Sequence, residues 1–340
     1  MERHGRRSAR RGAASGRRGM SWPGDGIGAR IVAAARRAAT TFAAALLALP
    51  LLAGGAPAET AEEPIRFALN EWTGQRISTH LVAAILAKAG HPVTFVEAAY
   101  MDQLDEIAAG RIDVAMEYWS TSGMPVLQEA LSDGSVQILG ATGMHAREEW
   151  WYPVYMKERC PGLPDWRALK QCAATFAVPE TAPKGRYLAG PVTWGGFDEE
   201  RVAALGLDFE VVHADTEADL YATLEAAVAK HQPVLLWVYT PHWAPVRHQG
   251  EWVQFPAFTD ACYREQRFDC GKPSGPIWKV GAKDLPERWP EAVQAIRAFH
   301  LSNEEMGAMI ARVDVDGLTI EETVDEWMGA NEAVWKSWLD

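Results

Sequence analysis

The stretch that decides the fold joins a strand-like apolar run to an aromatic residue and a helix start, and it reads Pro233-Val234-Leu235-Leu236-Trp237-Val238-Tyr239-Thr240-Pro241-His242-Trp243. Thr240 is a candidate N-cap and Pro241 suits the first helical position, which would leave the next backbone N–H groups free. Free amides at a helix start attract anions, whereas indole and phenol faces attract poorly hydrated cations. A site built from both would suit a small zwitterion.

Two further stretches repeat this combination, and a fourth aromatic residue closes another strand-like run. The stretches are Trp72-Thr73-Gly74-Gln75 and Trp194-Gly195-Gly196, and the fourth aromatic is Trp119, which ends the run Ile112–Trp119. Strand alternation places Glu117 on the same face as Trp119. We also expect Trp151 to face the site, and Trp237 to lie in the core.

Strand-like and helix-like segments alternate along the chain, which predicts α/β layers with mostly parallel sheets. In such sheets ligands bind beyond the carboxyl ends of the strands, where the aromatic stretches fall. The expected strands are Ile65–Leu69, Val93–Glu97, Ile112–Trp119, Trp151–Met156, Phe176–Val178, Phe209–Val212, Pro233–Tyr239 and Ile277–Val280, and the expected helices are Gly74–Ala89, Tyr100–Ala109, Asp198–Leu205 and Glu217–Lys230.

Residues 1–58 are typical of a secretory signal peptide, with an Arg-rich start, an apolar run from Ala38 to Ala53 and the cleavage pattern Ala56-Pro57-Ala58. We expect export to a periplasm without a lipid anchor, because no Cys lies near the cleavage point. The leader carries ten Arg against Glu2 and Asp25, so its removal takes the net charge from −12 to −20. Such an acidic chain has little attraction for nucleic acid.

The four cysteines predict disulfides, because an oxidising compartment and an even count favour them. Short loops favour the pairs Cys160–Cys172 and Cys262–Cys270, both in structural roles. No CxxC or His pair supports a metal site. In the tail, Thr319 and Glu322 form a capping box, and we expect Trp327, Trp335 and Trp338, like Trp289, to pack in the structure.

Enzyme signatures are missing from the sequence. It contains no Gly-x-Ser-x-Gly elbow, HExxH motif, phosphate loop or dinucleotide fingerprint, so we expect a binding protein without a cofactor. The competing class is a secreted hydrolase or carbohydrate-binding module that uses the same aromatic residues as sugar platforms.

Four motifs in order resemble the substrate-binding proteins of glycine betaine and proline betaine ABC importers over most of residues 64–338. They are Glu117-Tyr118-Trp119-Ser120, Gly190-Pro191-Val192-Thr193-Trp194-Gly195-Gly196, the stretch 233–243 and the tail from Phe299 to Trp338. The resemblance implies a periplasmic receptor with a type II-like binding-protein fold that works as a monomer. It also implies a permease partner and a ligand held in the cleft between two lobes. The lobes would comprise residues 64–152 plus 276–340, and residues 153–275.

The resemblance implies an aromatic cage for the cationic group and polar groups for the carboxylate of a betaine. The expected ligand contacts are Trp72, Glu117, Trp119, Trp151, Trp194, Gly195, Tyr239, His242 and Trp243. Two residues depart from the family pattern, because Tyr239 replaces a Trp and Glu117 replaces a neutral amide. A carboxylate near the cage keeps trimethylamine N-oxide, choline and carnitine open as ligands. A periplasmic sensor subunit would use the same pocket.

Overall fold

The computed structural model describes residues 63–340, and the expected signal peptide lies outside them. Within the described chain, the strands form one nine-stranded sheet in the order β2-β1-β3-β9-β4-β7-β5-β6, with β8 beside β4. The strands are β1 Ile65–Leu69, β2 Val93–Glu97, β3 Val114–Trp119, β4 Val136–Pro153, β5 Gly185–Ala189, β6 Phe209–His213, β7 Leu236–Thr240, β8 Gly250–Trp252 and β9 Ser274–Ala282.

The sheet is mixed, so the expectation of mostly parallel pairing is wrong at its centre. β1 pairs in parallel with β2 and β3, and β5 pairs in parallel with β6 and β7. Between these two groups, β4 and β9 are antiparallel to each other and to their outer neighbours β7 and β3. The first part of β4 pairs only with β9, and residues Arg147–Trp151 pair with β7. Two long strands therefore connect two smaller parallel sheets.

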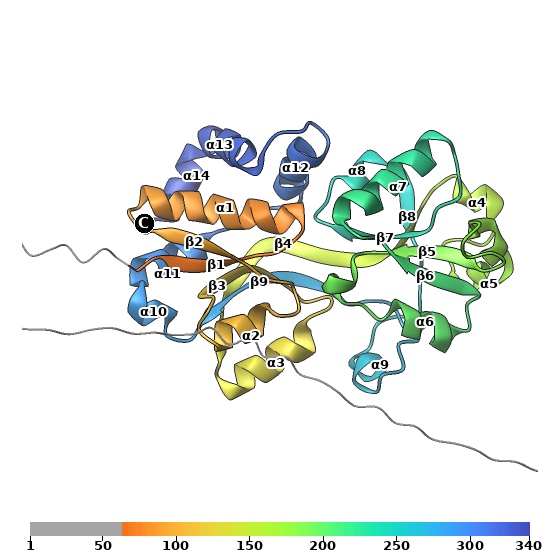
Figure 1. Ribbon diagram of the computed structural model, residues 1–340, viewed down its shortest axis with the longest axis horizontal. Coiled ribbons are helices and arrows are strands. Elements are labelled where there is room, and N and C mark those ends of the chain that lie inside the picture. Colours follow the sequence, from red (N-terminus) through yellow and green to blue (C-terminus); the bar gives the residue numbers. More distant parts are fainter. Residues whose placement is uncertain (1–62) are drawn as a thin grey trace, which may run out of the picture. The chain divides into compact units, whose positions relative to one another are not determined.

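Helices flank both parallel groups, which gives a two-lobed α/β architecture (Figure 1). The helices of the β1–β3 lobe are α1 Thr73–Lys88, α2 Gln103–Ala108, α3 Met124–Asp133, α10 Leu285–Arg288, α11 Pro290–Ala298, α12 Asn303–Asp314, α13 Ile320–Ala330 and α14 Glu332–Lys336. Those of the β5–β7 lobe are α4 Met156–Arg159, α5 Leu169–Cys172, α6 Asp198–Leu205, α7 Glu217–Ala229, α8 Ala244–Arg247 and α9 Asp260–Arg264, with short 3-10 turns at Trp166–Ala168, Ala173–Phe176 and Val192–Trp194.

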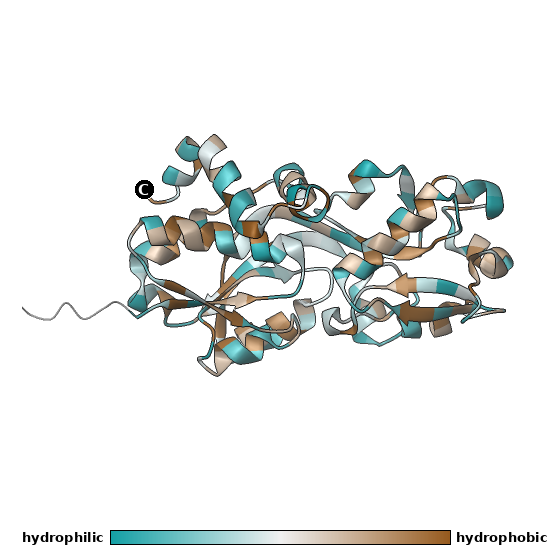
Figure 2. Cartoon of the chain, turned by 45° about the horizontal axis from the view of Figure 1, so that its top comes forward, coloured by the Kyte–Doolittle hydropathy of each residue, from teal (hydrophilic) through white to brown (hydrophobic). Residues whose placement is uncertain are grey.

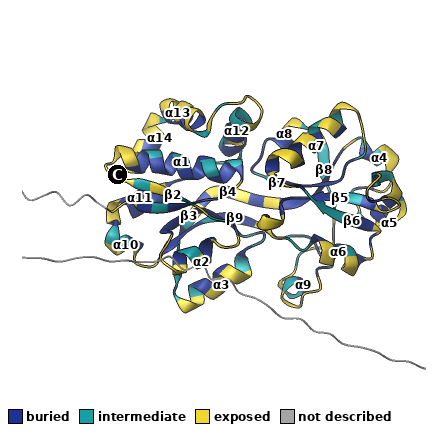
Figure 3. Ribbon diagram, viewed as in Figure 1, coloured by how far each residue is buried: buried dark blue, intermediate teal, exposed yellow. Residues whose placement is uncertain are grey.

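Helix α1 forms because apolar residues recur at helical spacing along it. Ile77, Leu81 and Ile85 are fully buried, and the helix stops before Gly90, whose φ of +95° favours glycine. Figure 3 shows the outer turns of the helices exposed, whereas the inner strands β1, β3 and β5 are buried and the edge strand β2 is partly exposed. Figure 2 shows the matching pattern of hydropathy, with hydrophobic residues along many strands and hydrophilic residues on the outer helical turns.

Two strand predictions differ from the structure in the second lobe. Phe176–Val178 is not a strand, because Ala173–Phe176 form a 3-10 turn. The strand of this region is β5, Gly185–Ala189, which the sequence analysis missed. β5 is short and Arg186 interrupts its apolar character, so its pattern resembles a loop. β4 is also far longer than the predicted Trp151–Met156, because its first half alternates polar and apolar residues.

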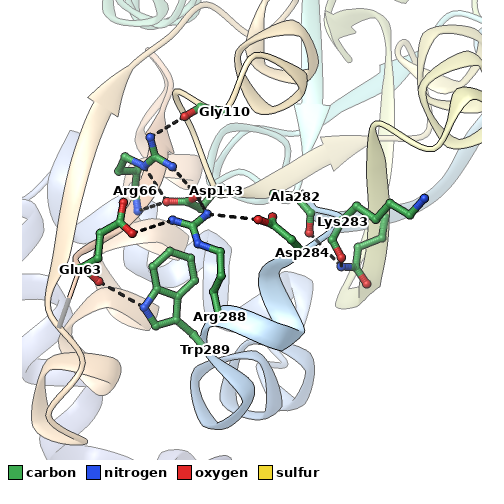
Figure 4. A network of polar contacts seen from close by, with 10 residues as sticks. Glu63, Arg66, Gly110, Asp113, Ala282, Lys283, Asp284, Arg288 and Trp289 are labelled. Atoms are coloured by element: carbon green, nitrogen blue, oxygen red, sulfur yellow. Dashed lines mark hydrogen bonds and ion pairs between the residues drawn. The ribbon is translucent and has the colours of Figure 1, made fainter.

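A network of charges around Asp113 fixes the first described residues (Figure 4). The buried Asp113 carboxylate accepts hydrogen bonds from the side chains of Arg66, at 2.7 and 2.8 Å, and Arg288, at 2.7 Å. Arg288 also pairs with the Glu63 carboxylate at 3.2 Å, and the Trp289 indole donates to the Glu63 carbonyl at 3.2 Å. The start of the described chain is therefore held against α10 and α11.

The C-terminal segment begins with the predicted capping box, but it forms two helices, α13 and α14, rather than one. The capping box of Thr319 and Glu322 is present at the start of α13. Trp327, Trp335 and Trp338 are buried, which confirms their structural role. Among residues 63–340, no helix has the length and apolar character needed to cross a membrane.

Both predicted disulfides are present. Cys160 is bonded to Cys172 between α4 and α5, and Cys262 is bonded to Cys270 beyond the start of α9. The bonded residues are 12 and 8 positions apart, so each bond closes a short loop in the unfolded chain.

Replacing either cystine pair with serine should lower the thermal stability. On the chain-entropy model a loop of this length contributes about 2.5–3 kcal/mol, which corresponds to roughly 4–5 °C in the melting temperature of a chain of this size. Differential scanning calorimetry of the two double-serine variants checks this. A melting temperature equal to that of the parent in both variants would contradict it.

Candidate functional site

Six aromatic side chains enclose a cavity between the two lobes, which we call the aromatic cavity. Its aromatic lining is Trp72, Tyr100, Trp119, Trp194, Trp237 and Tyr239, and its other lining residues are Ser122, Glu148, Ala189, Gly190, Gly195, Asp198 and Lys272. The cavity has a volume of about 40 Å³, counted as space open to the centre of a water-sized sphere. One water needs about 10–15 Å³ on that scale. The cavity therefore fits a small solute.

The carboxyl ends of strands deliver the aromatic residues, as the sequence predicts. Trp119 is the last residue of β3, and Trp72 lies between β1 and α1. Trp194 ends the 3-10 turn that follows β5, and Trp237 and Tyr239 lie on β7. The first two residues belong to one lobe and the last three to the other. Trp237 is buried in the core, as predicted, and it also lines the cavity beside Tyr239.

The rings meet mainly edge to face, so each such contact covers at most one face of one of the two rings. Trp72 meets Trp194 across the lobes with ring centroids 6.0 Å apart and planes at 76°, and Trp119 meets Tyr239 at 5.4 Å and 78°. Trp194 and Tyr239 are nearly perpendicular, at 89°. Such a box attracts a trimethylated ammonium group through its π faces and through apolar contact.

Glu117 lies behind this box and does not line the cavity. Its Oε2 atom accepts hydrogen bonds from the indole N–H groups of Trp72 and Trp119, each at 3.1 Å. Its Oε1 atom accepts from the hydroxyl of Ser78 at 2.6 Å. Burial raises the pKa of this carboxyl, and the three donors oppose that rise. The bond to Trp119 confirms that Glu117 and Trp119 share a face of β3.

Glu148, Asp198 and Lys272 form the polar side of the cavity. The Lys272 ammonium lies 3.7 Å from a Glu148 oxygen and 3.9 Å from an Asp198 oxygen, and all three side chains are nearly fully buried. Burial raises the pKa of Glu148, which Lys272 only partly opposes. Burial also disfavours ionised Asp198, but Lys272 and Arg201 outweigh it and lower its pKa. Asp198 is therefore the ionised acid, and Glu148 is the one that takes up a proton more readily.

A second row of charges holds this polar side in place. Arg201 pairs with Glu149 and lies 3.7 Å from Asp198, and the Trp150 indole donates to Asp198 at 2.7 Å. The backbone N–H of Lys272 donates to Glu149 at 2.9 Å. The buried polar cluster contains three acids, Glu148, Glu149 and Asp198, and two bases, Arg201 and Lys272. It therefore carries a net negative charge when all five side chains are ionised. That balance favours a ligand with a positive end and disfavours a free carboxylate.

The sequence analysis missed these polar residues, together with Tyr100. Asp198 was interpreted only as a helix start, and Lys272 lies in an irregular segment before β9. The signal that could have found Glu148 is the pair Glu148-Glu149 in a strand otherwise rich in aromatic residues. Lys272 follows Cys270 by two residues, so the disulfide to Cys262 anchors the segment that carries it.

Trp151 is not part of the aromatic cavity. Its side chain is 1% exposed and packs over Gly250, where even a Cβ atom would lie 1.8 Å from the indole. In β4 the residue that reaches the cavity is Glu148. A strand beginning at Trp151 would turn this indole toward the site, but β4 already pairs with β7 from Arg147 onward.

His242 and Trp243 lie next to the cavity wall without lining it. The predicted helix start at Pro241 is wrong, because α8 begins at Ala244 and contains only four residues. The His242 ring accepts from the Ala244 N–H at 3.1 Å and thus caps this turn. Burial lowers the pKa of His242, although Asp314 opposes the shift, so the ring is neutral. The Trp243 indole donates to Asp314 at 2.9 Å.

Glu217 connects the two lobes directly behind the cage. From the first turn of α7 it accepts the backbone N–H of Thr73 at 2.8 Å and the hydroxyl of Tyr239. Thr73 begins α1 in the other lobe, and the N-cap residue Trp72 makes no side-chain capping bond, so Glu217 caps the first amide of this helix. The Thr73 hydroxyl donates to Asp314 at 2.8 Å. Burial and the nearby Asp314 raise the pKa of Glu217 to about 7.

Together, the two-lobed fold and its cage define a solute-binding protein for small molecules with a methylated cationic group. The chain belongs to the family described as the substrate binding domain of the ABC-type glycine betaine transport system, whose sequence model matches residues 63–330. It is thus the solute-binding component of an ABC importer for quaternary ammonium compounds, and its membrane partner is the permease of that importer. The family consists of periplasmic receptors.

Relatives of known function agree with this membership. The chain is 31% identical over 309 residues to the trimethylamine N-oxide-binding protein of Pelagibacter ubique (strain HTCC1062), which covers 88% of this chain and 98% of that protein.

Solved structures share the fold at much lower identity. Lactococcal OpuAC in its closed form with glycine betaine matches with a TM-score of 0.64 at 16% identity, over 82% of this chain and 100% of that one. A glycine betaine and L-proline-binding protein (ProX) of Borrelia burgdorferi matches with 0.67 at 16%, over 82% and 97%. A choline-binding protein in complex with choline matches with 0.66 at 14%, over 81% and 91%.

Alanine in place of Trp119 or Trp194 should weaken binding of a methylated ammonium ligand by roughly 1–3 kcal/mol, the range for a desolvated cation–π contact with lost apolar burial. Phenylalanine should restore part of the loss, because it keeps a π face. Isothermal titration measures both effects. Trp166→Ala is the matched control, because this indole lies outside the cavity, and a parent-like affinity in both cage variants would refute the role of the cage.

Glu217 should make the folded state less stable as the pH rises. Its folded pKa of about 7 lies above the ordinary value of 4.5, so the folded protein binds more protons between these values. The free energy of unfolding should therefore fall across this window, by at most about 3 kcal/mol, and stay level above it. Glu217→Gln should remove that part of the slope in urea titrations. The exposed Glu210→Gln should leave the slope intact, and identical slopes in all three proteins would contradict the assignment.

Proposed function

We propose that the captured solute is trimethylamine N-oxide. The observation that carries this proposal is the polar side of the aromatic cavity, where Lys272 is shared by Glu148 and Asp198. A betaine carboxylate placed there would meet two acids and one base that is already paired. An N-oxide carries its positive nitrogen and its acceptor oxygen next to each other, so it needs a cage and one donor.

Two donors are available for the N-oxide oxygen. The first is a protonated Glu148, since burial raises the pKa of that carboxyl. The second is the Lys272 ammonium. The methyl groups would then face Trp72, Trp119, Trp194, Trp237 and Tyr239, with Gly195 completing the wall. Further support comes from the compact cavity and from the 31% identity to the trimethylamine N-oxide-binding protein.

Choline is the second candidate, because the net negative charge of the buried polar group would suit a cation without a carboxylate. Glycine betaine, which the family is named for, is third, since its carboxylate lacks an unshared cation. Carnitine is longer and would require the lobes to separate.

The cellular setting completes the proposal. Residues 1–58 would direct export and be removed, and the mature chain would work in the periplasm as a monomer without a lipid anchor, nucleic acid or catalytic activity. Its lobes would comprise residues 64–152 plus 276–340, and residues 153–275, with β4 and β9 as the connections between them. Ligand would stabilise the closed arrangement because cage residues come from both lobes.

Isothermal titration of the mature protein with trimethylamine N-oxide, choline, glycine betaine, carnitine and a neutral sugar tests the assignment. We expect the tightest binding for trimethylamine N-oxide and none for the sugar. Tighter binding of choline or glycine betaine would overturn the ligand, and binding of the sugar alone would overturn the class.

The pH dependence should separate the two leading candidates. As the pH falls from neutral to mildly acidic values, Glu148 gains a proton and becomes a donor. Affinity for trimethylamine N-oxide should rise by about two- to tenfold, the contribution of one hydrogen bond, whereas affinity for choline should fall because a countercharge is lost. In Glu148→Gln, which donates at every pH, the rise should vanish. A trimethylamine N-oxide affinity that falls on acidification in the parent would exclude Glu148 as the donor.

A further inference from the structure

The carboxylate of Glu117 is buried behind the aromatic cavity with only neutral partners. It is 1% exposed and accepts hydrogen bonds from Ser78, Trp72 and Trp119. Within residues 63–340, no Lys, Arg or His forms an ion pair with it. Three hydrogen bonds satisfy the oxygens geometrically, but they do not neutralise the charge. A buried carboxylate without a cation is costly, so its presence needs a compensating interaction.

One oxygen atom joins the two cage tryptophans of this lobe. Oε2 accepts both indole N–H groups at 3.1 Å, although Trp72 precedes α1 and Trp119 ends β3. Both rings line the aromatic cavity. The carboxylate therefore bonds to the positive edge of both rings without itself lining the cavity.

We propose that Glu117 is the countercharge of the ligand cation and acts through the two indoles as a positioning residue. The proposal rests on the proposed function only for the class of ligand, a methylated ammonium compound. An anion at the indole N–H increases the negative potential of the ring face, and the low local dielectric preserves its attraction for the cation. The same two bonds fix the orientation of both rings. When the ligand binds, its positive charge compensates the buried carboxylate.

This role differs from simple support of the rings. If Glu117 only orients the indoles, an uncharged acceptor that leaves them in place should serve equally well. If its charge matters, the affinity should fall although the cage keeps its geometry. A variant that removes the charge of Glu117 and keeps its shape therefore distinguishes a countercharge from a residue that only orients the indoles.

The test compares the parent, Glu117→Gln and Ser78→Ala by isothermal titration with trimethylamine N-oxide and by crystallography. Glu117→Gln should weaken binding about tenfold with Trp72 and Trp119 in place, the scale of a desolvated cation–π contact. Ser78→Ala is the matched control, because it removes one hydrogen bond from the same carboxylate and keeps the charge, so its affinity should change by less than about threefold. Parent-like affinity in Glu117→Gln, or a loss accompanied by displaced indoles, overturns the charge role.

A failure of the proposed ligand is distinguishable from a failure of this inference. If the parent does not bind trimethylamine N-oxide, the proposed function fails, and choline or glycine betaine, whichever the parent binds, becomes the probe for the same comparison.

A measurement on the parent protein covers the case in which Glu117→Gln does not fold. The indole N–H resonances of Trp72 and Trp119 should titrate together in proton–nitrogen NMR spectra, because they share one carboxylate. Bound ligand should lower their common midpoint, since a cation favours the ionised acid. A midpoint that ligand leaves unchanged or raises overturns the proposal.

Discussion

The antiparallel pair of β4 and β9 is the constraint on which the rest of this structure depends. Because both strands run through the sheet between two parallel groups, each lobe contributes strand ends to one shared space. Glu148 lies on β4, and Lys272 lies two residues before β9, so the polar side of the cavity is carried by the connections themselves. The aromatic residues come from the parallel groups on either side. The strands that connect the lobes therefore also position the polar residues of the candidate site.

Charge is arranged in layers around the aromatic box. One layer contains Glu148, Asp198 and Lys272, which touch the cavity, and Glu117 lies behind the rings on another side. Glu217 forms a third position, where a carboxylate bonds to Tyr239 and to the first amide of α1. All of these charged groups are buried, so salt screens their electrostatic effects less than it screens those of surface charges. A ligand with a positive end would meet negative potential from several directions.

The sequence predicted the parts of the site that local patterns encode. Aromatic residues at the ends of strand-like runs can be recognised in the sequence, so Trp72, Trp119, Trp194 and Tyr239 were predicted as site residues. Strand alternation placed Glu117 beside Trp119. It did not predict partners that only tertiary folding brings together. Lys272 reaches Glu148 from far along the chain, and Glu217 caps a helix that begins at Thr73. Trp151 was assigned wrongly because the register of β4 depends on β7, which local sequence does not specify.

The secondary structure was predicted where its signals are local, and the sheet topology was not, because it depends on residues far apart in the sequence. Amphipathic α1 and the capping box of α13 were predicted because their signals lie within a few residues. The mixed sheet was not, because the direction of β9 relative to β3 is fixed only by the path of the chain between them.

The edge-to-face contact of Trp72 with Trp194 has an optical consequence. These indoles come from different lobes and their centroids are 6.0 Å apart. Electronic transitions of two such chromophores couple, and this coupling decays with the cube of their separation. Opening of the lobes would therefore weaken the circular-dichroism signal of this pair in the far ultraviolet, where the strong indole transition lies, so the pair is an intrinsic reporter of lobe closure.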